Sequence, residues 1–412
     1  MNENKLNYKK TFLLSFGFLA SSIAWSIYNA YVPLILEGFL TSTTMIGLVM
    51  VIDNVFGVIF QPVFGRLSDK TRTRFGRRMP YIFIGIPICA AAFILIPHMN
   101  NLYSLMAVLI IFTFVMSAWR SPVVALMPDI TPGPMRSQAN GIVNLMGGVG
   151  SIIAFLGGGM LIRAGGFPLP FLMSACVMLA ALAVLALFVR EPKHAYEPEE
   201  KTEKEKVKLG KDELKSLLLI LFGIFFWFTG YNAVETFFTL YATNSLGMDP
   251  GSAGMTLAIF SVSLVAFAIP AGFIGARIGR RKAILIGLSG ITLLFLPMIF
   301  FANIWMVRIC LLFAGLCWAL ININSLPMVV RLSGDAKIGT YIGYYYFFSF
   351  SSQIVSPVLF GFIRDLVGHY NVLFTYSCIA FALAAVCLLF VRHGEEEPEK
   401  VTAAQILENM DD

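Results

Sequence analysis

The segment GRLSDKTRTRFGRR, from Gly65 to Arg78, joins two long apolar stretches of the sequence. It contains six cations and a single acid, Asp69. A short basic segment between two membrane-length stretches is typical of a loop held on the cytoplasmic side of a membrane. A partial copy, GARIGRRK, runs from Gly275 to Lys282, and the pattern R-x-G-R-R recurs in it 203 residues later. The two segments together indicate an internally duplicated membrane protein.

The composition also places the chain in a bilayer. Of its 412 residues, 58% are hydrophobic and 13% are charged, and the mean hydropathy is +0.78. Soluble domains carry roughly 45–50% apolar and about 25% charged residues. The net charge of +6 resides in segments that flank apolar stretches, which indicates membrane topology rather than a nucleic-acid-binding face. The six cysteines lie inside apolar stretches without a CxxC pair, so we expect reduced packing residues rather than metal ligands or disulfides.

Twelve stretches reach the roughly 20 apolar residues that a spanning helix needs. They are 11–36, 44–65, 79–97, 102–127, 138–162, 168–189, 216–243, 252–276, 283–301, 304–330, 338–363 and 370–391. The loops at 37–43, 98–101, 245–251 and 302–303 contain no Lys or Arg, whereas the alternate loops are basic. An even number of spans with this bias predicts that both termini are cytoplasmic, and we expect the cell (plasma or inner) membrane.

Charge also marks the expected domain boundaries. The segment 191–214 is rich in both acids and bases and has little to bury, which predicts a solvated linker. The triplet Tyr28-Asn29-Ala30 recurs as Tyr231-Asn232-Ala233, again 203 residues later. We therefore expect an all-α protein of two pseudo-symmetric six-helix halves with a substrate site between them near the midplane. The expected units are an N-terminal half at 1–190, a charged cytoplasmic linker at 191–214, a C-terminal half at 215–392 and a cytoplasmic tail at 393–412.

Few ionisable side chains lie inside the predicted spans, and each is a functional candidate because a charge in the bilayer is costly unless it is paired or hydrated. At 1.5 Å per residue, Asp53 lies roughly 20 Å and Arg120 roughly 13 Å from the cytoplasmic end, so the two side chains can meet. Protonation of Asp53 would release Arg120, which is a workable proton-coupling switch; the alternative is a permanent structural ion pair. Glu235 takes the place of Val32 of the first repeat and is a candidate substrate ligand or second proton site, or else a glutamate at a wet cavity mouth.

Amides and aromatic residues gather in four of the predicted spans. Amides in lipid need partners, so we expect them to face a wet cavity or another helix. Aromatic rings beside amides and carboxylates suit a neutral polyol, although aromatic belts at the interface account equally well for some of them. The substrate-binding candidates are Trp25, Tyr28, Asn29, Tyr231, Asn232, Glu235, Trp318, Asn322, Asn324, Tyr345 and Gln353.

A second group of charges lies at the cytoplasmic ends of the spans in the first half. Carboxylates at such positions can hold arginines and helix N-termini when the cytoplasmic side is closed. We therefore predict a cytoplasmic gate rather than substrate ligands for this group. Its members are Asp69, Arg77, Arg78, Asp129 and Arg136.

Two stretches resemble a known family. The run from Gln61 to Ile82, QPVFGRLSDKTRTRFGRRMPYI, resembles the QP…G…SD…RFGRRRP pattern of proton-coupled sucrose carriers. The run SPVVALMPDITP, from Ser121 to Pro132, is similar to the P-x-R-A-L-x-x-D run that ends their fourth helix, but Val124 stands in place of its arginine. The chain thus resembles major facilitator transporters, in particular the sucrose/hexose–proton symporter family of animals, bacteria and plants, near the glycoside–pentoside–hexuronide cation symporters.

The resemblance implies sugar uptake driven by a proton gradient, with two halves that rock around a central site. We expect a secondary active transporter, not an enzyme, that imports a disaccharide or other glycoside such as sucrose or maltose by alternating access. A proton-driven exporter of another small solute and a sodium-coupled glycoside symporter are the alternatives, since carboxylates and amides bind either ion. The expected partners are the sugar and the bilayer, with no nucleic acid, no cofactor and no metal site, and the expected functional unit is a monomer.

Overall fold

The computed structural model describes residues 6–189, 191, 211–331 and 338–391. Within these residues, twelve helices are long and apolar enough to cross a membrane. The regular structure that they form is helical, so the prediction of an all-α membrane protein with twelve spans is confirmed.

The helices fall into two sets of six, in chain order. The first set is α1 (Tyr8–Glu37), α2 (Thr43–Lys70), α3 (Met79–Leu95), α4 (Leu102–Ile130), α5 (Arg136–Gly165) and α6 (Pro168–Phe188), with short 3₁₀ turns η1 (Ile96–His98) and η2 (Gly133–Met135). The second set is α7 (Lys211–Leu246), α8 (Pro250–Ile278), α9 (Arg280–Phe300), α10 (Ile304–Arg331), α11 (Ile338–Val367) and α12 (Val372–Leu389).

Several helices continue past the apolar stretches that predict them. Helix α2 ends at Lys70, so the first part of the basic segment is helical and the loop itself runs over residues 71–78, called the basic loop below. Helix α7 begins at Lys211, inside the predicted linker 191–214. Charged helix ends of this kind reach beyond the apolar layer, where their side chains meet water at little cost. Residues 192–210 of the predicted linker and the predicted tail at 393–412 lie outside the described residues.

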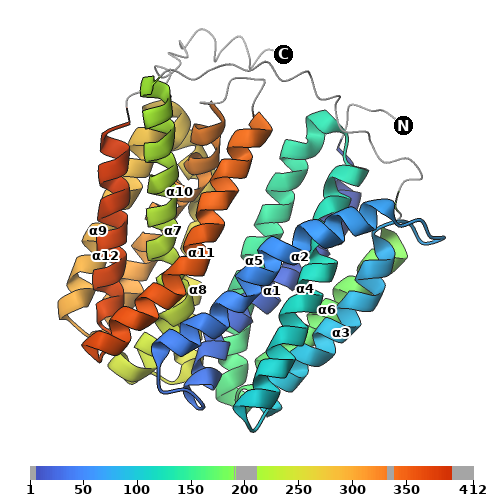
Figure 1. Cartoon of the computed structure of the whole chain (residues 1–412), viewed down its shortest axis with the longest axis horizontal. Coiled ribbons are helices and arrows are strands. Elements are labelled where there is room, and N and C mark those ends of the chain that lie inside the picture. Colours follow the sequence, from blue (N-terminus) through green and yellow to red (C-terminus); the bar gives the residue numbers. More distant parts are fainter. Residues whose placement is uncertain (1–5, 190, 192–210, 332–337, 392–412) are drawn as a thin grey trace.

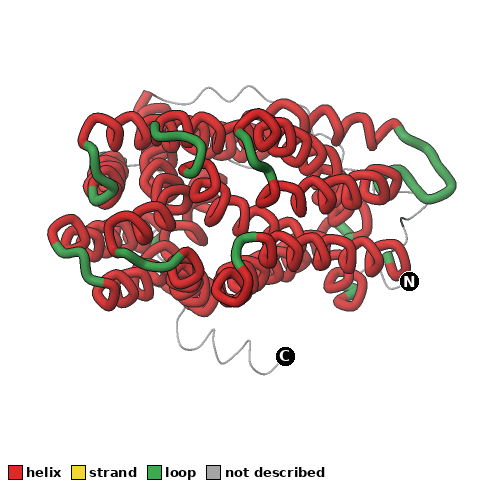
Figure 2. The backbone as a smooth tube through the Cα atoms, turned by 90° about the horizontal axis from the view of Figure 1, so that it is seen from below, coloured by secondary structure: helices red, strands yellow, loops and turns green. Residues whose placement is uncertain are grey.

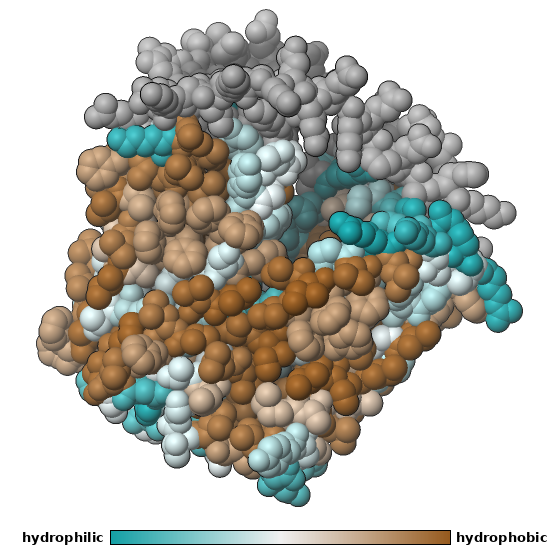
Figure 3. Space-filling view, viewed as in Figure 1, coloured by the Kyte–Doolittle hydropathy of each residue, from teal (hydrophilic) through white to brown (hydrophobic). Residues whose placement is uncertain are grey.

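The two sets form two bundles that stand side by side (Figure 1). Across the boundary α5 packs against α8, α2 against α11, and α1 against α7. Seen end-on, the two groups of helices surround a central region (Figure 2). Apolar side chains cover much of the side of the molecule, while polar ones gather toward the ends (Figure 3). This is the surface that a lipid-embedded pair of bundles requires.

The halves approach most closely at the end opposite the basic loop, and glycines permit that approach. A Cβ on Gly159 of α5 would lie 2.5 Å from the carbonyl oxygen of Gly251 in α8. Likewise, a Cβ on Gly361 of α11 would lie 2.5 Å from the carbonyl oxygen of Thr43 in α2. Any larger residue at these positions would push the backbones apart, since small residues let membrane helices pack closely. The halves are therefore closed against each other at this end.

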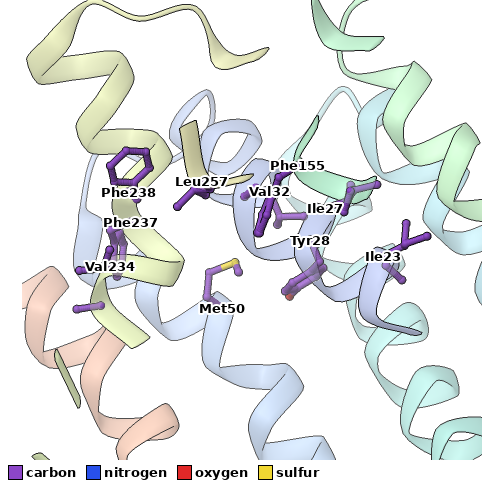
Figure 4. Packing of buried hydrophobic residues seen from close by; sticks show 14 of the residues in the cluster. Ile23, Ile27, Tyr28, Val32, Met50, Phe155, Val234, Phe237, Phe238 and Leu257 are labelled. Atoms are coloured by element: carbon purple, nitrogen blue, oxygen red, sulfur yellow. The ribbon is translucent and has the colours of Figure 1, made fainter. Parts of the chain in front are cut away.

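Buried apolar side chains of both bundles lie on either side of their boundary (Figure 4). Ile27 and Val32 of α1 and Phe237 of α7 are fully buried, and Phe155 of α5 and Leu257 of α8 are nearly so. Large buried side chains such as these each contribute roughly 1.5–3 kcal/mol relative to exposure to water. They form buried apolar surfaces of the two halves near the closed end.

The two copies of the basic motif also share an unusual backbone conformation at their glycine. Gly76 in the basic loop has φ +110° and Gly279 at the start of α9 has φ +94°. Only glycine adopts such values at low cost. The shared R-x-G-R-R pattern therefore encodes the same sharp entry into the helix that follows in each half.

Candidate functional site

A cavity of about 420 Å³ lies between the halves, in the range typical of small-molecule sites. Helices α1, α2, α4 and α5 line it from one half, and α7 and α11 from the other. Toward the basic loop it continues into a hollow of about 560 Å³ that Arg66 and Asp69 border. Gly57, Gln61 and Phe350 line both spaces. The central cavity is thus open at the basic-loop end and closed at the end where the glycines meet.

Asp53 and Arg120 both line this cavity, as the sequence predicts, but they form no direct salt bridge in this conformation. The Asp53 carboxylate accepts hydrogen bonds from the backbone N–H of Asn54 at 2.6 Å and from its side-chain amide at 2.8 Å. The Arg120 Nε is buried without a hydrogen-bond partner among the described residues. Asp53 and Arg120 remain within electrostatic range of each other. A guanidinium with an unused donor beside a carboxylate can bind a ligand or pair with the acid when the cavity changes shape.

Glu235 of α7 lines the same cavity and lies within electrostatic range of Asp53. The side chain of Asn29, from α1 of the other half, lies beside the Glu235 carboxylate in the cavity lining. Asn232, one turn earlier on α7, also lines the cavity and donates to Ser352 of α11 at 3.3 Å. The repeated Asn29 and Asn232 therefore both face the centre, and the first of them connects the two halves.

The two tyrosines of the repeated triplet differ in their surroundings. Tyr231 lines the cavity and stacks on Trp318 of α10, with ring centroids 4.2 Å apart and ring planes 6° apart. Tyr28 is fully buried and stacks on Phe112 of α4 at 5.6 Å, away from the cavity. Trp25 supplies the aromatic lining on the α1 side. The candidates Trp318 and Tyr28 thus support the cavity wall from behind rather than line it.

Three further candidates lie outside the cavity lining. Asn324 donates to the carbonyl oxygens of Ala271 and Leu320, which ties α10 to α8. The hydroxyl of Tyr345 lies 3.0 Å from that of Ser325, which joins α11 to α10. Asn322 is exposed on α10. Polar groups in the membrane need partners, and Asn324 and Tyr345 find them on neighbouring helices. The predicted substrate ligands that line the cavity are Trp25, Asn29, Tyr231, Asn232, Glu235 and Gln353.

The cavity also contains polar residues that the sequence reasoning missed. Asn54 and Gln61 line it from α2, next to Asp53 and Gly57. The spacing along α2 could have indicated this face, because positions 53, 57 and 61 recur every four residues and therefore share one side of the helix. The serines of α1 give the same signal beside Trp25 and Asn29, since Ser22 and Ser26 are also four residues apart.

The predicted gate residues are gathered around the basic loop, within the first half. Arg77 pairs with Asp129 at 2.7 Å, and Arg78 pairs with Asp129 at 3.0 Å and with Asp69 at 2.5 Å. Arg136 donates to the carbonyl oxygen of Pro128 at 3.4 Å. These contacts tie the ends of α2 and α4 to the start of α3, and the start of α5 to the end of α4. In this conformation they brace one half and do not bridge the two.

Glu191, beyond the end of α6, joins the same network and was not among the predicted residues. Its carboxylate accepts the backbone N–H groups of Arg77 and Arg78, the latter at 2.9 Å. Burial raises the pKa of the Glu191 carboxyl above its ordinary value. Gly76 is indispensable here, because a Cβ would overlap the Glu191 carboxylate. The first residue of the predicted linker is thereby fixed to the basic loop.

A family model described as the Major Facilitator Superfamily matches residues 14–249 and 220–408, so the chain belongs to that superfamily. A tetracycline resistance protein, class H, from Pasteurella multocida is 24% identical over 87% of this chain and 90% of its own length. An isoprimeverose transporter from Lactiplantibacillus pentosus is 21% identical over 70% of this chain and 63% of its own length. The relatives therefore include transporters of different solutes.

Solved structures agree with this assignment. A bacterial homolog of the human lysosomal transporter Spinster, inward-facing and occupied, aligns with a TM-score of 0.70 at 13% identity, over 94% of this chain and 95% of that one. The nucleoside transporter NupG aligns with a TM-score of 0.68 at 14% identity, over 92% and 98% of the two chains. At these identities the likeness concerns the fold alone. Family and fold together identify a multi-pass membrane protein that acts as a secondary transporter, not as an enzyme.

Proposed function

We propose that this transporter carries a neutral sugar, a disaccharide or other glycoside such as sucrose or maltose, into the cell together with protons. The observation that carries the proposal is the set of amides around Trp25 in the central cavity: Asn29 and Asn54 from one half, Asn232 and Gln353 from the other. Amides both donate to and accept from sugar hydroxyls, and an aromatic ring packs on the apolar face of a sugar. A sugar held by both halves is well placed to follow their rocking motion.

Asp53, Glu235 and Arg120 supply the proposed coupling to protons. An unpaired charge is costly in a cavity that closes within the membrane, so each carboxylate needs a proton or a cationic partner before closure. Arg120 is the cationic partner of one ionised carboxylate in the cavity. When Asp53 binds a proton, Arg120 is released from it. Glu235 is linked to substrate through Asn29, because the Asn29 amide lies beside the Glu235 carboxylate and a sugar hydroxyl bound to this amide changes the surroundings of the acid. Sugar binding and proton binding therefore favour each other in this mechanism.

The location and orientation follow from charge. The basic loop holds most of the cations of its segment, and segments of this kind stay in the cytoplasm. We infer a plasma or inner membrane with both termini cytoplasmic, so the cavity described here opens inward. Each chain contains a complete cavity between its own halves, which supports a functional monomer.

A second candidate function is proton-driven export of another small solute. It is favoured by relatives that align over most of the chain, among them the class H tetracycline resistance protein and the multidrug resistance protein MdtG of Enterobacter lignolyticus, 24% identical over 73% of this chain. The same carboxylates serve either direction, since a proton gradient drives import by symport and export by antiport. A direct transport measurement separates the two.

The deciding experiment measures uptake of labelled sucrose and maltose into proteoliposomes with an inward proton gradient. Accumulation that a protonophore abolishes supports the proposal, and a sodium gradient in its place tests the sodium alternative. A parallel set of vesicles tests labelled tetracycline. If tetracycline moves in a proton-dependent way and neither sugar is transported, the proposal is wrong and the protein is an exporter.

The variant Asp53→Asn tests the coupling. We expect proton-driven accumulation to fall to the level of equilibration, while exchange of labelled for unlabelled sugar continues, because the amide mimics the protonated acid. Loss of exchange as well would reduce Asp53 to a structural role. The matched control is Asp249→Asn, at the exposed start of α8, which should transport as the wild type does.

The variant Arg120→Ala tests the partner of Asp53. We expect transport to be lost in protein that still folds, because the carboxylates of the cavity then lack their cation. Folding is checked by gel filtration and thermal unfolding. Wild-type accumulation in this variant would rule out the pairing of Arg120 with Asp53.

A further inference from the structure

A second, apolar pocket of about 90 Å³ adjoins the central cavity, and the proposed sugar site leaves it without a role. It lies between α1 and α5 of one half and α7, α8, α9, α10 and α12 of the other. Ser26, Ser151, Tyr231 and Glu235 line both spaces and so form the boundary between them. The Ser26 hydroxyl donates to the Ser151 hydroxyl at 2.9 Å, so these two groups satisfy each other at the boundary.

Beyond that boundary the walls are hydrocarbon, apart from the hydroxyl of Ser261 on α8. Phe260, Phe295 and Phe381 surround the inner part, with Leu264 and Leu311 between them. Phe295, Phe381 and Leu311 close the deep end of the pocket and expose at most 1% of their surface. Apolar cavities of this kind stay dry, and one of about 150 Å³ in another protein holds benzene. A volume of about 90 Å³ therefore suits a branched alkyl group of three or four carbons.

We propose that this pocket is a subsite for an apolar group attached to the sugar, so that the preferred substrate is an alkyl or similar glycoside rather than a plain sugar. This inference rests on the proposed function, because the sugar ring occupies the polar cavity. The junction at Ser151, Tyr231 and Glu235 is polar, as the glycosidic oxygen and the neighbouring hydroxyls require. The alkyl group then lies against Phe260 and Leu264 of α8, with Phe295 and Phe381 behind them at the deep end.

The experiment compares matched methyl and isopropyl β-glycosides of glucose, galactose and xylose. Binding to the full chain in nanodiscs is measured by quenching of tryptophan fluorescence, since Trp25 lines the cavity. Each buried methylene strengthens binding roughly fourfold, so the two extra carbons of the isopropyl glycoside should make it bind about fifteenfold tighter than its methyl partner.

The variant Ser261→Leu fills the pocket from α8, where Ser261 is nearly buried in its wall. We expect the preference for isopropyl to disappear while methyl glycosides bind as before. The matched control is Ser289→Leu, at an exposed position on α9 outside the pocket lining, which should keep the preference. Ser261→Val adds less volume and should reduce the preference for isopropyl only partly. This variant provides the test if Ser261→Leu folds poorly.

Two results would overturn the inference. Equal binding of the methyl and isopropyl series, or a preference that persists in Ser261→Leu, removes the alkyl subsite and leaves the sugar transporter intact. Binding of no glycoside in either series also removes the subsite, and the sugar site itself is removed only if sucrose and maltose uptake fails as well.

Discussion

The two ends of the transporter use their acidic residues differently. At the basic-loop end, Asp69 and Asp129 bind arginines of their own half. At the opposite end, Asp365 of α11 binds the start of α2 in the other half, accepting from Ser42 Oγ at 2.6 Å and from the backbone N–H of Thr43 at 2.8 Å. The first arrangement braces one bundle, whereas the second holds the two bundles together.

A helix N-terminus explains why the second arrangement is strong. The first N–H groups of α2 have no partner within their helix, and the helix dipole favours an anion beside them. Asp365 also accepts from the backbone N–H and the hydroxyl of Thr44, at 2.9 and 2.7 Å. One carboxylate thus satisfies four donors from the other half. These bonds must break for this end to open.

Glu37 adds a second bridge at the closed end. Its carboxylate accepts from the Asn244 amide at 2.9 Å and from the Tyr370 hydroxyl at 3.3 Å, and both donors belong to the other half. Burial raises the pKa of Tyr370 to about 12, so this hydroxyl keeps its proton and donates at any physiological pH. The closed end is therefore held by carboxylates that accept hydrogen bonds from donors in the opposite half.

The largest effect on stability is expected at the basic-loop end, from Asp129→Asn. Asp129 is almost buried between Arg77 and Arg78, and removing one member of a buried charge network costs about 3 kcal/mol or more. We expect the melting temperature to fall by several degrees, as measured by thermal unfolding in detergent. Asp69→Asn is the matched control, because Asp69 is half exposed and should lower it far less. Equal effects of the two substitutions would contradict the picture of a brace centred on Asp129.

The largest effect on conformation is expected at the closed end, from Asp365→Asn. Hydrogen bonds to a charged group are worth about 1.5–3 kcal/mol, so we expect the ratio of open to closed molecules at this end to rise by about 30-fold. Spin labels at Tyr103 and Phe301, exposed at this end of the two halves, report the separation in a background without the six native cysteines.

The same labels give the control for Asp365→Asn. In Asp69→Asn the distance distribution should stay that of the wild type, since the arginine partner of Asp69 lies in its own half. A distribution unchanged in Asp365→Asn would show that the glycine contacts alone keep this end closed.

The smallest effect is expected from Arg163→Ala. Arg163 and Asp249 also face each other across the halves at the closed end, but their charged groups are 4.0 Å apart and about half exposed. Exposed pairs of this kind contribute about 0–1 kcal/mol, so transport should change by less than about twofold. A loss comparable to that of Asp365→Asn would mean that charge alone, rather than hydrogen bonding at a helix terminus, closes this end.

The sequence predicted the charged residues of the centre but not their contacts. Asp53, Arg120 and Glu235 stand out because ionisable residues are rare in apolar stretches, and all three line the cavity. Glu235 and Asn29 lie side by side although they are 206 positions apart in the chain, and no spacing rule links them. Counting amides and aromatics was less selective, because Asn324 and Tyr345 serve helix packing by the same chemistry that would serve a ligand.

The twelve spans, the duplication and the positions of the rare intramembrane charges can be read from the sequence alone. The reason is that polar groups are costly in lipid, so the residues of each segment decide whether that segment can span the membrane. The tertiary structure decided which end of the molecule is closed, which amides face the cavity and where the apolar pocket lies. Those features depend on helices from two halves that are distant in sequence. Their relative positions are set by glycine contacts and by single acids such as Asp365 that bind across the boundary.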